Sequence, residues 1–191
     1  MQNVKPLLPV VAADEWLQPV ADKIWDRHER YLQRMQAIEE QTSSIVAGGD
    51  LTINAGKNIG GEDNGLSADV GGTADLNVPE NIYISSNEDL NLDETTVSGK
   101  VDVTVVGGNV TNDGVIEGES IDVSSLGSDV GQKQDPLTVK VDKVDAHGDN
   151  VYIKNLKDTE IGKITAEDEA YIETPGNLTG SDEQAPNIKA D

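Results

Sequence analysis

The chain has 191 residues, a formal net charge of −22 and a sequence pI near 4.1. This acidity argues against nucleic acid and anionic membrane surfaces as partners, because binding to either depends on clustered Lys and Arg. The chain has no Cys, which excludes disulfides and thiolate metal sites, and no stretch reaches transmembrane length. It also has no Phe and only two Trp and four Tyr, which favours a narrow aliphatic core over a globular one.

Composition divides the chain into two parts. Residues 1–41 hold five basic and seven acidic residues, whereas residues 42–191 hold nine basic and 29 acidic ones. Both Trp and all three Arg lie in the first part. We therefore predict two structural units, an N-terminal lead with a helix over 1–41 and a β-structured domain over 42–191.

The N-terminal part carries an apolar stripe at helical spacing. The lead is punctuated by Pro6 and Pro9, and Pro19 suits the first turn of a helix over 19–41. The stripe consists of residues seven apart, namely Leu17, Ile24, Tyr31 and Ile38. We predict that this amphipathic helix caps the following domain, with pairing to another chain as the alternative. Trp16 and Trp25 are candidate partner contacts, although a Trp on an apolar stripe more often belongs to the local core, which is the interpretation we favour.

From Thr42 onward the sequence alternates apolar and polar residues in short runs separated by Gly, Asn and Asp. Such runs predict strands with one buried face. The predicted strands are 50–53, 75–78, 81–84, 89–92, 101–106, 120–123, 137–141, 150–153 and 170–173. Two segments lack the pattern: residues 60–72 show little β-character, and residues 127–136 read as a projecting loop.

These runs recur with a period near twenty residues. The pattern of Val101 and Val103 recurs twenty residues later as Ile121 and Val123, and Tyr152 recurs nineteen residues later as Tyr171. A period of this length, filled with short strands, is typical of a solenoid. We therefore predict a mainly β fold, a right-handed parallel β-helix of about 20 residues per rung, preceded by the amphipathic helix.

One rung carries a family resemblance. The segment 44–59, SIVAGGDLTINAGKNI, resembles the rung consensus of the filamentous haemagglutinin family of two-partner-secreted adhesins. The resemblance implies a corner at Gly48-Gly49 and a turn residue at Asp50 or Asn58. It also implies inward side chains at Leu51, Ile53 and Ile59. Later runs, such as residues 108–118, resemble the looser coils of large bacterial surface adhesins.

The resemblance implies a non-enzymatic shaft of a large secreted protein on the outer surface of a bacterium. Its implied partners are a host or neighbouring-cell receptor or glycan, and adjacent segments of the same fibre. Two alternatives remain open. One is a receptor- or glycan-binding module in which Tyr83, Tyr152 and Tyr171 line a groove. The other is a carbohydrate-active enzyme on the same fold.

No catalytic motif supports the enzyme. The sequence lacks a nucleophile elbow, a phosphate-binding loop and a zinc-binding helix motif. Asp102, Asp122, Asp142 and Asp145 are predicted to project outward, but such alternation is typical of a solvated strand face, and the nearby Lys100, Lys140 and Lys143 read as surface residues. We predict no catalytic residues.

Metal ligands are equally sparse. We predict no cofactor, with calcium left open at the oxygen-rich turns 62–65, 112–114 and 145–150. None of these turns matches an EF-hand or a calcium-binding β-roll repeat, and Asn-Asp-Gly forms turns without metal. His28 and His147 lack a second ligand at motif spacing, so we predict a helix-face and a loop histidine.

Overall fold

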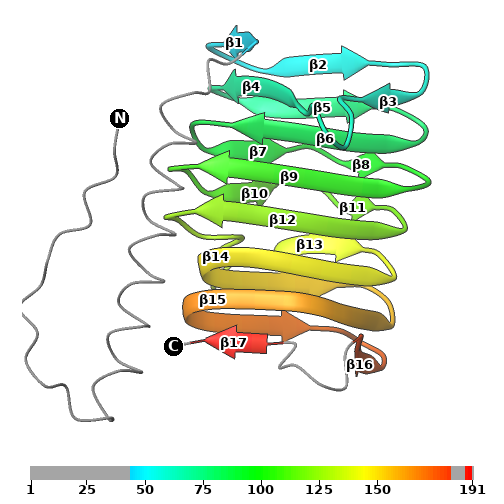
Figure 1. The fold of residues 1–191 in the computed structure, drawn as a ribbon, viewed down its shortest axis with the longest axis vertical. Coiled ribbons are helices and arrows are strands. Elements are labelled where there is room, and N and C mark those ends of the chain that lie inside the picture. The colour runs from blue at the N-terminus through cyan, green and yellow to red at the C-terminus, as the bar shows by residue number, and fades with distance from the viewer. Residues whose placement is uncertain (1–43, 182–187, 191) are drawn as a thin grey trace, which may run out of the picture. The chain divides into compact units, whose positions relative to one another are not determined.

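The computed structural model describes residues 44–181 and 188–190, which form a parallel β-solenoid of about seven turns. The described residues are mainly β and contain no helix. Strands of successive turns run in the same direction, one below another (Figure 1). The helix predicted over 19–41, together with Trp16 and Trp25, lies outside the described residues, as does His28.

The strands group into faces, which we call first, second and third. The first face contains β1 (Ile45–Ala47), β3 (Asn58–Ile59), β4 (Leu66–Val70), β6 (Asn81–Ser86), β9 (Lys100–Val106), β12 (Ser120–Leu126) and β17 (Ile188–Ala190). The second contains β2 (Leu51–Asn54), β5 (Thr73–Asn77), β7 (Leu90–Leu92) and β10 (Val110–Asn112). The third contains β8 (Thr95–Thr96), β11 (Ile116–Glu117) and β13 (Leu137–Lys140).

Two long strands bend around corners and serve more than one face. β14 (Lys143–Asn155) pairs with β12 near its start and with β13 near its end. β15 (Thr159–Glu173) follows β14 along almost its whole length and also pairs with β16 (Leu178–Gly180). The last turns are therefore wound from nearly continuous strand, as Figure 1 shows.

The turns stack in the register that the sequence period predicts. On the first face, Ile82, Val101, Ile121, Val144 and Ile161 are successive partners, 19, 20, 23 and 17 residues apart. The parallel register of Val101 with Ile121 confirms the solenoid and rules out an antiparallel sandwich for this region. Because each turn pairs its backbone with the turn above and the turn below, interior turns have no open strand edge.

The core is a column of aliphatic side chains inside the coil. On the second face the in-register residues Leu90, Val110, Val130 and Val151 are all fully buried. The inward side chains implied by the haemagglutinin resemblance are confirmed: Ile59 is buried, and Leu51 and Ile53 pack against the core. Val, Ile and Leu suffice because a coil of about twenty residues per turn encloses only a narrow interior, which explains the shortage of aromatic residues.

Side chains at the corners hydrogen-bond the backbone of the next turn. One continuous ladder of such bonds runs through Asp89, Asn109, Asp129 and Asn150, which lie on successive turns. The side-chain oxygen of each of the first three accepts the backbone N–H of the following member of the ladder, at 2.6, 3.1 and 3.0 Å. Both turn residues implied by the resemblance act likewise: Oδ1 of Asp50 accepts the N–H of Thr73, and Oδ1 of Asn58 accepts that of Asn81. These bonds explain why Asn and Asp recur at the corners.

Asn155 makes the same kind of side-chain-to-backbone hydrogen bond inside the core. It is fully buried, its Oδ1 accepts the N–H of Val141 at 3.1 Å, and its Nδ2 donates to the carbonyl of Val141 and to Oγ1 of Thr159. Replacing Asn155 by Ala leaves the buried backbone N–H and carbonyl of Val141 without their side-chain partner, so we expect a loss of about 3 kcal/mol of unfolding free energy in urea titrations.

The matched control for Asn155 is Asn177, an exposed residue whose side-chain Nδ2 donates to Oδ2 of Asp158 at 3.1 Å. Replacing Asn177 by Ala exposes the freed groups to water, so a loss below about 1 kcal/mol is expected. Similar losses for the two variants would contradict the role of burial.

Every predicted strand overlaps an observed one, but the two segments predicted to lack strands were partly wrong. Residues 60–72 contain β4, in which Ala68 and Val70 are buried between β1 and β6. Residues 127–136 contain Val130, which bridges Val110 and Val151 in the core. In both places, pairing with neighbouring turns stabilises the extended backbone although local propensity is weak.

Candidate functional site

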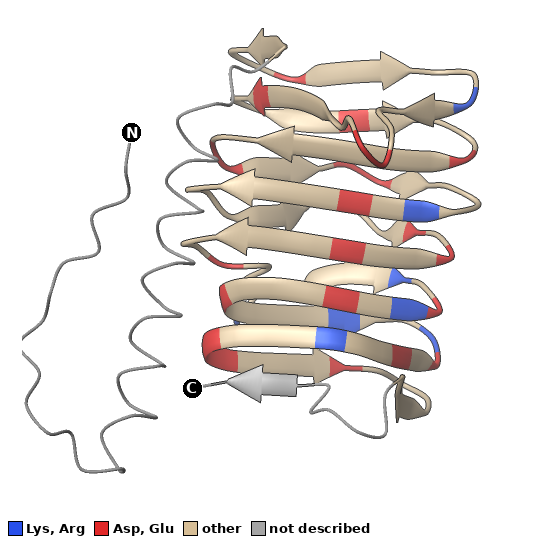
Figure 2. Ribbon diagram, viewed as in Figure 1, with Lys and Arg blue, Asp and Glu red and all other residues tan. Residues whose placement is uncertain are grey.

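Three aspartates form a vertical file on the first face. Asp102, Asp122 and Asp145 are in-register partners on β9, β12 and β14, so their side chains project outward from successive turns. Figure 2 shows the resulting acidic bands one below another on these strands. Lys100 lies beside the file, and its Nζ donates to Oδ2 of Asp102 at 2.7 Å and to Oδ2 of Asp122 at 3.3 Å. The outward projection predicted for these residues is confirmed.

Partial burial and the charges of neighbouring side chains perturb the titration of the carboxyl in the middle of this file. Partial burial is the largest factor that raises the pKa of the Asp122 carboxyl, and the charges of Asp102 and Asp145 raise it further against the attraction of Lys100. Partial burial would lower the pKa of Lys100, but its bonds and charge attraction to Asp102 and Asp122 outweigh burial and raise it. Lys100 thus offsets two of the three stacked carboxylates, and Nζ of Lys143 lies 3.5 Å from Oδ2 of the third, Asp145.

The raised pKa of Asp122 has a consequence for stability. A group whose folded-state pKa lies above its ordinary value of 3.8 stabilises the fold fully below that value, and this contribution is lost as the pH rises through the folded-state pKa. We therefore expect Asp122→Asn to raise the unfolding free energy at pH 7 by about 0.5 kcal/mol, a small effect because the carboxylate is partly solvated. The gain should vanish at pH 3.

Urea titrations at pH 7 and pH 3 measure this difference. Asp142→Asn is the control, because Asp142 is exposed and forms a surface ion pair with Lys157 at 2.7 Å. Its replacement removes an attraction and should not stabilise the protein. A loss of stability for Asp122→Asn at pH 7 would contradict the electrostatic account.

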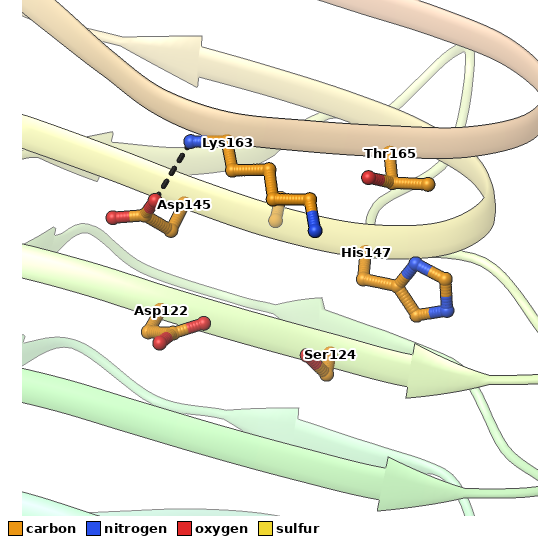
Figure 3. Close-up of a pocket in the computed structure, with 7 residues that line it drawn as sticks. Asp122, Ser124, Asp145, His147, Lys163 and Thr165 are labelled. Atoms are coloured by element: carbon orange, nitrogen blue, oxygen red, sulfur yellow. Dashed lines mark hydrogen bonds between the residues drawn. The ribbon is translucent and has the colours of Figure 1, made fainter. Parts of the chain in front are cut away.

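A shallow depression of about 240 Å³ lies next to the lower end of the file (Figure 3). Asp122 and Asp145 line one side, and Ser124, His147 and Thr165, from three successive turns, line the other. The backbone N–H of Lys163 donates to Oδ1 of Asp145 at 2.7 Å. His147 lies on β14, not in the predicted loop, because residues 145–150 continue the strand around a corner. The depression brings carboxylates, an imidazole and a lysine to one open surface.

The oxygen-rich turns considered for calcium are used differently. Residues 62–65 form an outward loop, and residues 145–150 belong to β14. The side chain of Asn112 bonds the backbone of Thr138 and Gly114. Within residues 44–181 and 188–190, no group of three or more His, Asp or Glu is placed to hold a metal ion.

Two outward loops share one geometry. The first loop, residues 60–65, stands opposite Tyr83 of the next turn, because Ile59 pairs with Ile82 and Leu66 with Ile84. The second loop, residues 131–136, stands opposite Tyr152, because Val130 pairs with Val151 and Leu137 with Ile153. Each loop therefore replaces a single outward residue of its turn.

The two loops also close in the same way. Each begins with a glycine in the left-handed region, Gly60 at φ 67° and Gly131 at φ 68°. Each is closed by two reciprocal backbone hydrogen bonds of 3.0 Å, between Gly61 and Asn64 and between Gln132 and Asp135. The loops are thus ordered hairpin-like projections that place their tips beside a tyrosine.

The structure separates the three tyrosines whose meeting in one groove would have favoured the glycan-binding alternative. Tyr83 lies on the first face, opposite Asp102, whereas Tyr152 and Tyr171 are in-register neighbours on the second face. The second loop and these two tyrosines enclose a depression of about 330 Å³, which we call the tyrosine pocket. Its lining consists of Lys133, Pro136, Tyr152, Lys154, Glu169, Tyr171 and Glu173.

Two Tyr–Glu–Lys networks hold the tyrosine pocket together. In one, the Tyr152 hydroxyl donates to Glu169 at 3.0 Å, and Nζ of Lys133 donates to both Glu169 carboxylate oxygens at 3.0 and 2.9 Å. In the other, the Tyr171 hydroxyl donates to Glu173 at 3.0 Å, and Nζ of Lys154 lies 3.0 Å from the same carboxylate.

These networks shift the titration of their members. The hydrogen bond from Lys133 lowers the pKa of Glu169, and that from Lys154 lowers the pKa of Glu173. Burial, followed by the bond to Glu169, raises the pKa of Tyr152. Both carboxylates therefore stay ionised and both phenols stay protonated at neutral pH.

Sequence reasoning identified the tyrosines but missed their partners. Glu169 and Glu173 flank Tyr171 at the alternate positions that share its face, so period-2 alternation carried the signal for both. Lys133 lies 36 residues from Glu169 and approaches it only because the second loop projects across the next turns. No local sequence pattern predicts the contact between Lys133 and Glu169.

Comparison with known proteins assigns no relative. No protein-family model matches the chain, and searches of curated proteins and of solved structures find no match. Within the part of the chain that the structure describes, no helix has the length and apolar character needed to cross a bilayer.

Proposed function

We propose that this chain is a structural segment of a large secreted bacterial surface protein, in which the coil spans distance and displays loops. The observation that supports this most directly is the aliphatic column through the described turns, in which successive turns pair as parallel strands. Such a column transmits load along the coil without a large interior. At about 4.8 Å per turn, seven turns extend about 35 Å.

The surface charge suits such a role. Residues 42–191 carry nine basic and 29 acidic residues, a net charge of −20, and the acidic groups are spread over successive turns (Figure 2). Mutual repulsion of this size keeps neighbouring fibres apart and soluble. It also favours partners that do not depend on anionic groups, such as an uncharged glycan or a basic receptor surface.

The haemagglutinin-like rung adds the remaining parts of the proposal. Because residues 44–59 resemble that family, we propose a right-handed coil, export by two-partner secretion and a place on the outer surface of the cell. Adjacent segments of the same fibre would continue the stack. The amphipathic helix predicted over 19–41 would cap the coil or pair with another chain.

Export of a chimaeric adhesin tests the proposal. Residues 42–191 replace a segment of equal turn number in a two-partner-secreted adhesin that carries a distal epitope, with the parent adhesin as the control. We expect export, and an epitope that antibodies reach on intact cells. Retention inside the cell would contradict the shaft, and release of sugar products from polysaccharides by the purified chain would favour the enzyme instead.

A further inference from the structure

The tyrosine pocket is preformed. Gly131 and the reciprocal bonds between Gln132 and Asp135 fix the second loop, and Lys133 ties its tip to Glu169 two turns further along the coil. The walls of the pocket are therefore held before any ligand arrives. A ligand that enters fixed walls avoids most of the entropic cost of ordering them.

The pocket presents a fixed aromatic surface. Tyr171 is 46% exposed, although its chain neighbours Ala170 and Ile172 pack against the core and anchor its backbone. Tyr152 lies beside it, in register on the preceding turn, and is only 7% exposed. An aromatic ring bordered by polar groups suits a ligand with one apolar face and a polar edge. A pyranose ring has this shape, with C–H groups on its face and hydroxyls on its edge.

The polar groups beside the ring keep unused hydrogen-bonding capacity. An ammonium group offers three donors and a carboxylate about four acceptor sites. Lys133 donates twice, to Glu169, which also accepts from Tyr152; Glu173 accepts from Tyr171 and contacts Lys154. Donors and acceptors thus remain for sugar hydroxyls while both networks stay intact.

Charge selects among saccharides. The two lysines and two glutamates of the pocket sum to zero, whereas residues 42–191 as a whole carry −20. The surrounding field repels uronates and sulfated sugars, so it favours an uncharged ligand. We propose that the tyrosine pocket binds one or two pyranose units of a neutral oligosaccharide, with one unit stacked on Tyr171. This site is independent of the shaft role, because a chain that fails export can still bind sugar.

The first loop supplies an internal comparison. It forms a smaller depression of about 190 Å³ beside Tyr83. The register partner of Tyr83 on the next turn is Asp102, whereas the register partner of Tyr152 is a second tyrosine, Tyr171. Glu62 lines this depression from the loop, where Lys133 lines the tyrosine pocket. The first-loop depression therefore has a single aromatic ring and an acidic lining, and it should not bind the same sugars.

Saturation-transfer NMR on the full chain tests the site, with cellohexaose, maltohexaose and chitohexaose as neutral probes and hexagalacturonate as the anionic probe. We expect at least one neutral probe to bind with a dissociation constant on the order of 1 mM, typical of a small pocket. Tyr171→Ala and Tyr171→Leu should each weaken binding at least tenfold, and Tyr83→Ala should leave it unchanged. Circular dichroism verifies that each variant is folded.

Three outcomes would overturn the proposal. The first is absence of binding by every neutral probe at 10 mM, about ten times the expected dissociation constant. The second is binding that survives in Tyr171→Leu, which keeps an apolar side chain but removes the aromatic platform. The third is tighter binding of hexagalacturonate than of any neutral probe. None of these outcomes bears on export of the chimaeric adhesin, so the two proposals can fail separately.

Discussion

Replacing Gly131 by Ala is expected to destabilise the coil by about 3 kcal/mol. Gly131 has φ 68°, and a Cβ at this position would overlap the carbonyl oxygen of Tyr152 and lie 2.6 Å from the nitrogen of Leu137. The left-handed backbone costs an L-residue about 1–2 kcal/mol, and the overlap with fixed backbone atoms adds a similar amount. Urea titrations followed by circular dichroism measure the loss.

Gly127 is the matched control for Gly131. It also has a positive φ, 92°, but a Cβ there would meet no atom within 4 Å. Gly127→Ala should therefore cost only the backbone strain, about 1 kcal/mol. Equal losses at the two positions would show that backbone conformation alone accounts for the effect and that the close approach of the second loop to the next turn is unimportant.

Truncation of Ile121 tests the aliphatic column itself. Ile121 is fully buried and lies in register between Val101 and Val144, so its side chain contributes to the core between three turns. Ile121→Ala should leave a cavity that the paired backbone cannot close, with a loss of about 4 kcal/mol. Because each turn is stabilised by its neighbours, hydrogen exchange should accelerate in the turns on both sides.

Two controls separate packing from other effects of this substitution. Ser124 lies on the outer side of the same strand, β12, and Ser124→Ala should change stability by less than about 0.5 kcal/mol. Ile53 packs against the core in the first described turn but is only partly buried, so Ile53→Ala should cost about half as much as Ile121→Ala. An equal cost for Ile53 and Ile121 would contradict a column whose interior turns are the best packed.

The fold could be predicted because each turn repeats the same local requirement. Inward aliphatic residues alternate with polar ones, and the period near twenty places Val101 on Ile121 and Tyr152 on Tyr171. The prediction was weakest where turns depart from the repeat. At Leu66 and Val130 the neighbouring turns supply the pairing, although the sequence around these residues gives little sign of a strand.

Composition and spacing were enough to determine the mainly β solenoid, its period, its inward residues and the outward position of its aspartates, because these depend on alternation along a single strand. Only the tertiary structure decided which outward residues meet. It placed Tyr83 on a different face from Tyr152 and Tyr171, and brought Lys133 to Glu169. The physical reason is that contact between side chains of different turns depends on how many residues each loop inserts. A loop shifts which residues of neighbouring turns lie opposite one another, but it leaves the alternation of inward and outward residues in the flanking strands unchanged.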